Sequence, residues 1–270
     1  MSSSSIVVTG ASSGIGRELA IQLADTGREI WLVGRDAGRL EETADLVRGR
    51  GAVAHVVPLD LTDIERTGNY LTEHFPEGKV IDEVYLAAAV SSFGEFHETL
   101  PEDWERLYHT NLLSPIQWTH HFYRNMVPHR KGRIVLISSL AGYTGYPTAT
   151  AYAAMKGGLL GLFRSLCFEA GMNGVSLHLV SPGYVKTRIY EAAIFRKTSY
   201  EQTMKLINEM GFPMITPEKS ARLIIRGVAR NKAEFALPGY ASLLKWIAPR
   251  FPWMIGMVHR KMMKSFRRSA

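Results

Sequence analysis

Two side chains four residues apart, Tyr152 and Lys156, are of the types that can move a proton to a carbonyl oxygen. Residues at this spacing lie on one face of a helix. A phenol ordinarily loses its proton near pH 10, and an ammonium group about 4 Å away, at an effective dielectric of about 20, favours the phenolate by about 4 kcal/mol. The pair therefore predicts a Tyr152 whose pKa is lowered towards neutrality, where a general acid works best.

A glycine-rich segment at residues 10–16 predicts a second function, the binding of a phosphate group. It stands between a predicted strand and a predicted helix, where backbone N–H groups and the helix dipole attract negative charge and glycines let a phosphate come close. Its Gly-x3-Gly-x-Gly spacing differs from the usual dinucleotide fingerprint, so a plain strand–helix turn is the alternative. The residues expected to hold the pyrophosphate are Gly10, Ser12, Ser13, Gly14, Ile15 and Gly16.

The residues after the second predicted strand bear on the choice between the two nicotinamide cofactors. An acidic residue there binds the ribose hydroxyls of NAD, whereas guanidinium groups match a 2′-phosphate. This chain has Arg35 directly after Gly34, and Arg39 one helical turn later. NADP(H) is therefore predicted, unless both arginines are solvated surface residues. Asp60 and Leu61, after the third predicted strand, are expected at the adenine.

The elements that position these residues alternate between strand and helix. Apolar runs predict strands at residues 6–9, 30–33, 53–59, 84–88, 133–137 and 175–180. Helical periodicity predicts helices at residues 14–24, 36–49, 102–127 and 150–171. This alternation requires crossover connections, which give a parallel sheet covered by helices on both faces. The fold class is therefore α/β, with one domain over residues 1–239 and an extension over residues 240–270.

Charge and composition exclude several classes of protein. The formal net charge is +7, and the seven cations of residues 240–270, which include no acidic residue, account for all of it. A neutral body argues against nucleic-acid binding. The single cysteine, Cys167, fits a reducing compartment. The N-terminus lacks a basic signal-peptide region, and no apolar run reaches the ~18 residues of a spanning helix. A cytoplasmic protein is expected, with membrane association left open by the extension.

Taken in order, these motifs resemble the classical short-chain dehydrogenase/reductase family. The resemblance spans residues 5–237 and rests on the segment 9–16, Asp60, Asn111, Ser139, Tyr152, Lys156 and the segment 182–187. It implies a Rossmann-like, doubly wound sheet of seven parallel strands. It also implies a homodimer or homotetramer, and a stripe of small residues, Ala153, Gly157 and Gly161, would let a partner helix come close.

The resemblance implies a catalytic tetrad. Ser139 would donate a hydrogen bond to the substrate carbonyl, and Tyr152 would pass it a proton. Lys156 would bind the nicotinamide ribose and lower the pKa of Tyr152, while Asn111 would hold a water that relays protons to the lysine. Hydroxyl donors of this kind stabilise the charge that develops on a reduced carbonyl oxygen, as an oxyanion hole does. Ser138 is adjacent, but the spacing to Tyr152 favours Ser139, and neighbouring strand residues face opposite ways.

Two further segments bear on the cofactor. The residues that the resemblance places at the nicotinamide carboxamide are Pro182, Gly183, Val185 and Thr187. The segment 86–89 departs from the family, which usually has Asn-Asn-Ala-Gly where this chain has Leu-Ala-Ala-Ala. The missing amides would tie the central sheet together near the adenosine ribose, so only Ala88 is expected to contact the cofactor there.

An apolar substrate pocket is expected beside the tetrad. Its predicted walls are Val90, Phe93, Leu140, Tyr146 and Tyr184, followed by a mobile lid over residues 188–214. Such a lining suits a bulky or long apolar carbonyl compound. The alternative is that these side chains only pack the lid onto the body. The nine histidines show no zinc-ligand spacing, so no metal is predicted.

The extension over residues 240–270 alternates large apolar residues with its seven cations. A basic amphipathic segment is typical of proteins that bind a membrane surface or an acidic partner. Three interpretations stay open: peripheral membrane contact, an acidic carrier protein that bears an acyl substrate, and a C-terminal helix packed over the active site or a subunit interface.

The sequence therefore favours an NADPH-dependent reductase that converts a ketone or aldehyde to an alcohol. Its substrate is either a free, lipid-like ketone or a 3-oxoacyl thioester on a carrier protein. Two functions of other classes remain as alternatives: a non-catalytic NADP(H)-binding module, and a membrane adapter that acts through the extension.

Overall fold

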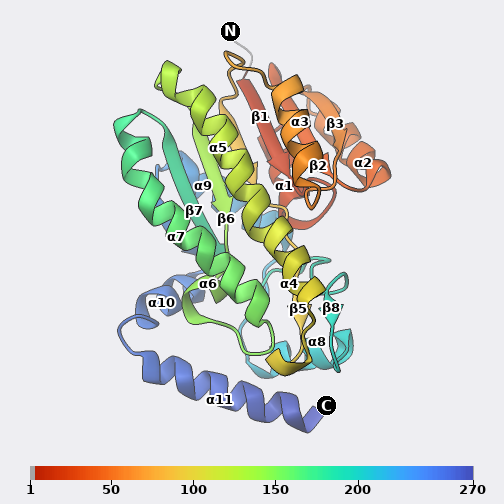
Figure 1. The fold of residues 1–270 in the computed structure, drawn as a ribbon, viewed down its shortest axis with the longest axis vertical. Helices are drawn as coiled ribbons and strands as arrows, with labels where there is room; N and C mark the ends of the chain where they lie inside the picture. The colour runs from red at the N-terminus through yellow and green to blue at the C-terminus, as the bar shows by residue number, and fades with distance from the viewer. Residues whose placement is uncertain (1–3, 270) are drawn as a thin grey trace.

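The computed structural model describes residues 4–269, and at its centre lies one parallel β-sheet (Figure 1). Its seven strands pair in the order β3-β2-β1-β4-β6-β7-β9, each with parallel neighbours. The order runs outward in both directions from the β1–β4 pair, as in a doubly wound sheet. The strands are β1 (Ser4–Thr9), β2 (Arg28–Gly34), β3 (Val53–Pro58), β4 (Glu83–Leu86), β6 (Arg133–Ile137), β7 (Ser176–Pro182) and β9 (Glu234–Leu237).

Two hydrophobic cores form, one on each face of the sheet. In β1, Ile6 and Val8 belong to one core and Val7 to the other, and all three are fully buried. Successive strand residues face opposite ways, so a continuous apolar run suits a sheet covered on both sides. The first core is closed by α1 (Gly14–Leu23), α2 (Ala37–Arg48) and α9 (Pro217–Ala229), and the second by α3 (Ile64–His74), α5 (Ser114–Met126) and α7 (Thr150–Met172).

The fold class predicted from the sequence, a doubly wound parallel sheet of seven strands, is confirmed. The single helix expected at residues 102–127 consists of three pieces: α4 (Pro101–Tyr108), a π-helical turn (His109–Leu113) and α5. The segment 188–214, expected as a lid, contains β8 (Ile194–Phe195) and α8 (Tyr200–Glu209). β8 pairs with β5 (Ser92–Phe93) in a small second sheet beside the strand ends.

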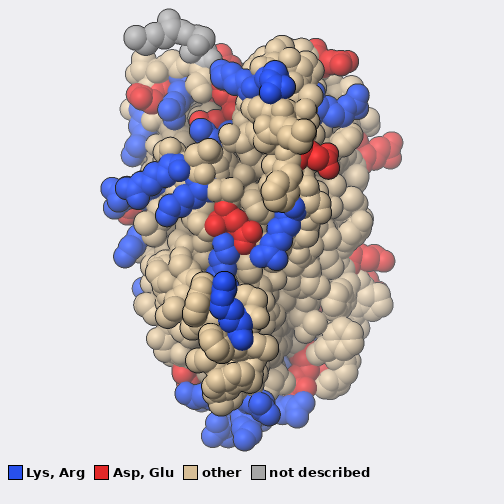
Figure 2. Space-filling model, turned by 90° about the vertical axis from the view of Figure 1, so that its left-hand side faces the viewer, with Lys and Arg blue, Asp and Glu red and all other residues tan. Residues whose placement is uncertain are grey.

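The extension forms two helices, α10 (Gly239–Ile247) and α11 (Pro252–Ser269), and α11 lies across one end of the molecule (Figure 1). Met262 and Phe266 of α11 are buried against Leu206 of α8. Lys and Arg side chains gather at this end of the molecule (Figure 2). The extension is therefore packed on the body, which is one of the three arrangements expected for it. Within residues 4–269, no helix is both long enough and apolar enough to cross a membrane.

Candidate active site

A cavity of about 750 Å³ opens at the carboxyl-terminal edge of the sheet, where the loops after the strands meet. Open α/β sheets bind their ligands at this edge. With the exception of Asn111, every predicted site residue lines it: Gly10, Ser12, Ser13, Gly14, Ile15, Gly16, Arg35, Arg39, Asp60, Leu61, Ala88, Val90, Phe93, Ser139, Leu140, Tyr146, Tyr152, Lys156, Pro182, Gly183, Tyr184, Val185 and Thr187.

The turn between β1 and α1 has room for backbone only. Gly10 has a φ of +71°, and a Cβ atom there would stand 2.8 Å from the Cα atom of Ala88. A Cβ atom on Gly16 would collide with the carbonyl oxygen of Gly10. Helix α1 begins at Gly14, so its first N–H groups and the positive end of its dipole lie at the cavity. A pyrophosphate group therefore fits this turn.

The end of β2 places two arginines and an aspartate at the cavity. Arg39 forms an ion pair with Asp36, and Asp36 also caps α2 by accepting a hydrogen bond from the Arg39 N–H at 3.1 Å. These hydrogen bonds hold the pKa of Asp36 below its usual value. Arg35 is exposed and, among residues 4–269, has no acidic partner. The pairing neutralises the aspartate and leaves Arg35 as the available cation.

Asp36 is a site residue that the sequence interpretation missed, because it considered only the arginines after Gly34. Its place immediately before a predicted helix is the signal that could have found it, since aspartate is a preferred N-cap residue. Asp60, which follows β3, is also held by hydrogen bonds from a residue close to it in the sequence. One of its carboxylate oxygens accepts hydrogen bonds from the N–H and the hydroxyl of Thr62 at 3.0 and 2.9 Å, which fixes its orientation at the cavity wall.

Two other side chains tie the sheet where the family's amides are missing. The Thr9 hydroxyl oxygen accepts hydrogen bonds from the N–H groups of Ala87 and Ala88 at 3.1 and 3.2 Å. The Asn111 carboxamide accepts from the N–H of Val90 at 2.9 Å and donates to its carbonyl at 2.8 Å. Together they fix the loop after β4 that lines the cavity.

Asn111 lies in the π-helical turn between α4 and α5 and is fully buried. Single π-helical turns inside α-helices are frequent at functional sites. Since both polar atoms of its carboxamide bond to Val90, this side chain positions the loop after β4. The water relay that the family resemblance implies for Asn111 stays a prediction.

Tyr152, Ser139 and Lys156 meet in the wall of the cavity. Helix α7 carries the tyrosine and the lysine one turn apart, and the loop after β6 carries the serine. The Ser139 side chain lies beside Tyr152, where it acts to lower the pKa of the phenol, and its hydroxyl oxygen accepts from the N–H of Ala141 at 3.2 Å. The Nζ atom of Lys156 lies 5.8 Å from the centre of the Tyr152 ring and donates to the Ile137 carbonyl oxygen at 2.9 Å.

Ser138 has a different role from its neighbour. Its hydroxyl donates to the backbone carbonyl oxygen of Lys156 at 2.9 Å, and the residue is buried. It therefore joins the end of β6 to α7, while Ser139 remains beside the tyrosine.

Burial changes the acid–base properties of the pair. It raises the pKa of Tyr152, against a smaller opposite effect of the Ser139 hydrogen bond, and it lowers the pKa of Lys156 to about 7. The expectation that an ammonium group lowers the pKa of Tyr152 is therefore wrong for this arrangement. Removal from water disfavours phenolate and ammonium alike, and the nearest polar partner of the lysine is the carbonyl of Ile137.

The segment 182–187, which is expected at the nicotinamide, forms backbone hydrogen bonds with the loop after β6 and with β9. The carbonyl of Pro182 accepts from the Leu140 N–H at 2.9 Å, and the Gly183 N–H donates to the Leu237 carbonyl at 2.8 Å. The N–H of Tyr184 donates to the hydroxyl of Tyr240 at 2.7 Å. Tyr240 belongs to α10 and lines the cavity, so the extension takes part in this wall. No pattern in the sequence predicted this contact.

Beyond the tyrosine and serine, the cavity widens into an aromatic chamber. The Phe93 ring lies 6.5 Å from Tyr146 and 6.3 Å from Tyr190, and the Phe212 ring lies 6.3 Å from Tyr184. The Tyr146 and Tyr184 hydroxyls are 3.2 Å apart and bond to each other. On the far side, α11 contributes side chains that were not predicted as pocket walls: Ile255, Val258, His259 and Met262.

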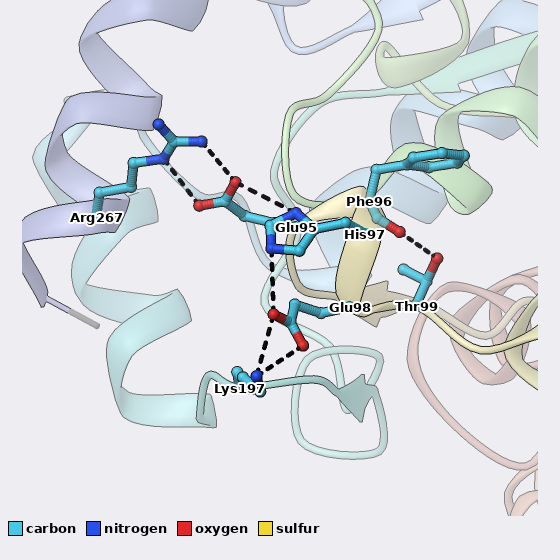
Figure 3. Close-up of polar contacts among 7 residues, drawn as sticks. All are labelled: Glu95, Phe96, His97, Glu98, Thr99, Lys197 and Arg267. Carbon is cyan, nitrogen blue, oxygen red and sulfur yellow. Dashed lines mark hydrogen bonds and ion pairs between the residues drawn. The ribbon is translucent and has the colours of Figure 1, made fainter.

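An ion pair fixes the end of α11 to the loop after β5 (Figure 3). Arg267 donates from Nε and Nη2 to the two carboxylate oxygens of Glu95 at 2.9 and 2.7 Å, which lowers the pKa of Glu95. In the same cluster, His97 and Lys197 each lie 3.1 Å from Glu98. These contacts join α11, the loop after β5 and the loop after β8, so the inner face of α11 closes the chamber. Within the described part of the chain, no three His, Cys, Asp or Glu side chains gather as a metal site requires.

Comparison with known proteins agrees with this geometry. The family described as short chain dehydrogenase matches residues 4–196. The chain therefore belongs to the short-chain dehydrogenase family and is an oxidoreductase of that family.

The individual relatives have low sequence identity to this chain, but the similarity extends over most of its length. Dehydrogenase/reductase SDR family member 7B of Xenopus laevis is 28% identical, with 90% of this chain and 78% of the relative covered. The 3-oxoacyl-[acyl-carrier-protein] reductase FabG of Aquifex aeolicus is 31% identical, with 67% and 73% covered. A solved metagenomic short-chain oxidoreductase in complex with NADP is 27% identical, with 88% and 95% covered and a TM-score of 0.71.

Proposed function

We propose that this protein is an NADPH-dependent reductase that converts a bulky or long apolar ketone to an alcohol. One observation carries the proposal: the Tyr152 hydroxyl, beside Ser139, stands in a single cavity that runs from the glycine turn at residues 10–16 to the aromatic chamber. A carbonyl group in the chamber would therefore stand between a proton donor and the cofactor.

The chain's own groups would hold the charge and supply the proton. The reduced nicotinamide, when bound, supplies the hydride. Hydroxyls of Ser139 and Tyr152 would stabilise negative charge on the carbonyl oxygen. Because burial raises its pKa, Tyr152 keeps its proton at neutral pH and has it available for that oxygen. Lys156, with a pKa of about 7, is suited to return a proton to the phenolate, and Ile137 holds its amino group in place.

The preference for NADPH rests on the charges at the end of β2. Arg35 is an exposed guanidinium at the cavity without an acidic partner among residues 4–269, and it suits a 2′-phosphate. Asp36, which would otherwise repel that phosphate, is neutralised by Arg39. The related metagenomic oxidoreductase binds NADP, which supports the same cofactor here.

An apolar substrate is supported by the walls of the chamber. Aromatic rings line it, and the Tyr146 and Tyr184 hydroxyls use part of their hydrogen-bonding capacity on each other. α11 adds the aliphatic side chains Ile255, Val258 and Met262. Concave apolar sites of this size accept hydrophobic ligands.

A 3-oxoacyl thioester on a carrier protein is the second candidate substrate. Two observations favour it: the 31% identity to a 3-oxoacyl-[acyl-carrier-protein] reductase, and the basic α11 near the cavity, which could hold an acidic carrier. Turnover of a carrier-bound 3-oxoacyl group and of the matching free ketone would be compared. Equal efficiency would rule out the carrier as the natural form of the substrate.

The proposal as a whole is tested by following NADPH oxidation with free ketones of increasing size. Efficiency is expected to rise from small polar ketones to bulky or long apolar ones. If NADPH binds but no carbonyl compound is turned over, the protein is a non-catalytic NADP(H)-binding module and not a reductase.

We also propose a homo-oligomer that assembles through α7, in the cytoplasm. Phe168 and Met172 of this helix, one turn apart, are 77% and 80% exposed, and a partner helix would cover both. Light scattering of the purified protein, and of a Phe168→Glu variant, measures the assembly. A monomeric wild-type protein would contradict it.

A further inference from the structure

The outward surface of the two C-terminal helices combines exposed apolar side chains with cations. Trp246, Trp253 and Met257 are 52%, 60% and 51% exposed. Helix α11, which carries Trp253 and Met257, lies across the end of the molecule where Lys and Arg side chains gather (Figures 1 and 2). The α10–α11 face consists of Leu243, Trp246, Arg250, Phe251, Trp253, Met257, Arg260, Lys261, Lys264 and Arg268, all of them exposed.

One face of helix α11 is buried against the body and the opposite face is exposed. Its inner face buries Met262 and Phe266 against the body. Trp253, Met257 and Lys264 follow helical spacing on the opposite side, where they are exposed. Apolar side chains occupy the first half of this outer face and cations the second half. Such a helix has the pattern of one that lies flat in a membrane interface.

The cations of this face are not used to hold the fold together. Within the described part of the chain, Arg260, Lys261 and Lys264 have no acidic partner. By contrast, Lys245 pairs with Glu234 at 3.0 Å, and Arg267 pairs with Glu95. The extension therefore has two cations that fix it to the body and a separate outward group that is free to meet another surface.

We propose that the α10–α11 face binds a lipid surface with anionic headgroups. Tryptophan prefers the boundary between water and acyl chains, and cations near it attract anionic lipids. A second copy of this face would bring its cations against each other, because residues 240–270 contain no acidic residue. An acidic protein would match the cations alone, whereas an anionic lipid surface matches both the cations and the exposed Trp246 and Trp253.

The position of the cavity supports a lipid surface in particular. Val258 of α11 lines the cavity together with Ile255 and Met262, so the helix that carries this face also forms a wall of the chamber. Binding through the α10–α11 face would place that wall of the chamber next to the lipid. The proposal goes beyond the reductase function and does not depend on it, because vesicle binding is measured without substrate.

The experiment is co-sedimentation of the full chain with two kinds of vesicle, phosphatidylcholine alone and equal parts of phosphatidylcholine and phosphatidylserine. The wild-type protein is expected to bind the anionic vesicles and to lose binding as salt is raised. Arg260→Gln with Lys264→Gln should weaken binding roughly 30-fold, because each cation near an anionic surface contributes a factor of about five. Trp253→Ala should weaken it roughly tenfold, because the side chain no longer enters the apolar layer.

A matched control also removes two positive charges, but at the opposite edge of the sheet. Arg50 and Lys232 are exposed and precede β3 and β9 at the amino-terminal ends of the strands. Arg50→Gln with Lys232→Gln should bind vesicles like the wild type, and cofactor fluorescence and thermal unfolding show that each variant is folded. The proposal is overturned if the wild type ignores anionic vesicles, if both double variants bind alike, or if the α10–α11 variants instead change the oligomeric state or the capture of an acidic carrier protein.

Discussion

The Nζ atom of Lys156 donates a 2.9 Å hydrogen bond to the backbone carbonyl oxygen of Ile137, at the carboxyl end of β6. The contact holds a fully buried amino group on the wall of the cavity, 5.8 Å from the centre of the Tyr152 ring. A neutral amine makes this bond without the desolvation penalty of an ammonium ion, which is why burial lowers the pKa of Lys156 to about 7. The lysine is thus set to return a proton to the Tyr152 phenolate near neutral pH.

The buried lysine predicts how stability depends on pH. Below pH 7 the lysine is protonated in both the folded and the unfolded chain, so its burial penalty is complete. Between about 7 and the ordinary value of 10.5, the unfolded chain binds more protons, so the free energy of unfolding rises with pH. Denaturant unfolding across this range should show a slope that is more positive in the wild type than in Lys156→Met, by up to about 1.4 kcal/mol per pH unit. Identical slopes would contradict the burial of an unpaired lysine.

The same group predicts a pH dependence of the reaction. Ketone reduction consumes a proton, and the fraction of protonated Lys156 falls as pH rises through about 7. Tyr152 stays protonated over this range because burial raises its pKa. The kcat/KM for reduction should therefore fall above pH 7, and that for alcohol oxidation should rise. A profile that is flat between pH 6 and 9 in both directions would remove the lysine from the proton path.

Cofactor preference should depend on Arg35. Arg35→Ser is expected to weaken NADPH binding by about 10- to 100-fold, because a charge-assisted contact to the 2′-phosphate is lost, and to leave NADH binding unchanged. Arg50→Ser, at the opposite edge of the sheet, is the control and should change neither. Fluorescence titration with both cofactors measures this. An equal loss for NADPH and NADH would place the arginine away from the 2′-phosphate.

The role of Thr9 can be separated from that of an ordinary buried threonine. Thr9→Val removes the acceptor of two backbone N–H groups and should lower the free energy of unfolding by about 1–3 kcal/mol. The control is Thr119→Val. The Thr119 hydroxyl is buried and has no hydrogen-bond partner among residues 4–269, so its loss should be neutral or stabilising. Equal effects in the two variants would show that Thr9 does not tie β1 to the loop after β4.

Much of the fold follows from local patterns along the chain. Apolar runs such as Ile6–Thr9, followed by a glycine turn, predict buried parallel strands and the phosphate loop. The sequence was less informative where packing alone decides. The π-helical turn around Asn111 has no local signature, and β9 (Glu234–Leu237) is a short edge strand that needs β7 beside it. The motif residues follow the ends of strands, and for this reason the site lies at the carboxyl edge of the sheet.

The errors at the site come from contacts between distant segments. Sequence spacing placed Lys156 one turn from Tyr152, but it could not show that the carbonyl of Ile137 is the lysine's partner or that burial outweighs charge attraction. Likewise, charge counting singled out residues 240–270 without showing that Tyr240 reaches Tyr184 or that Met262 lines the chamber. These facts depend on how α10 and α11 fold back onto the body.

The central claim is tested most directly by Tyr152→Phe, with NADPH binding and ketone turnover measured on the same preparation. The variant removes one hydroxyl and keeps the ring. NADPH binding should stay unchanged, while kcat falls by about 10²- to 10⁴-fold because the proton donor is gone. Turnover at the wild-type rate would contradict the assignment of Tyr152 as the acid that protonates the substrate carbonyl.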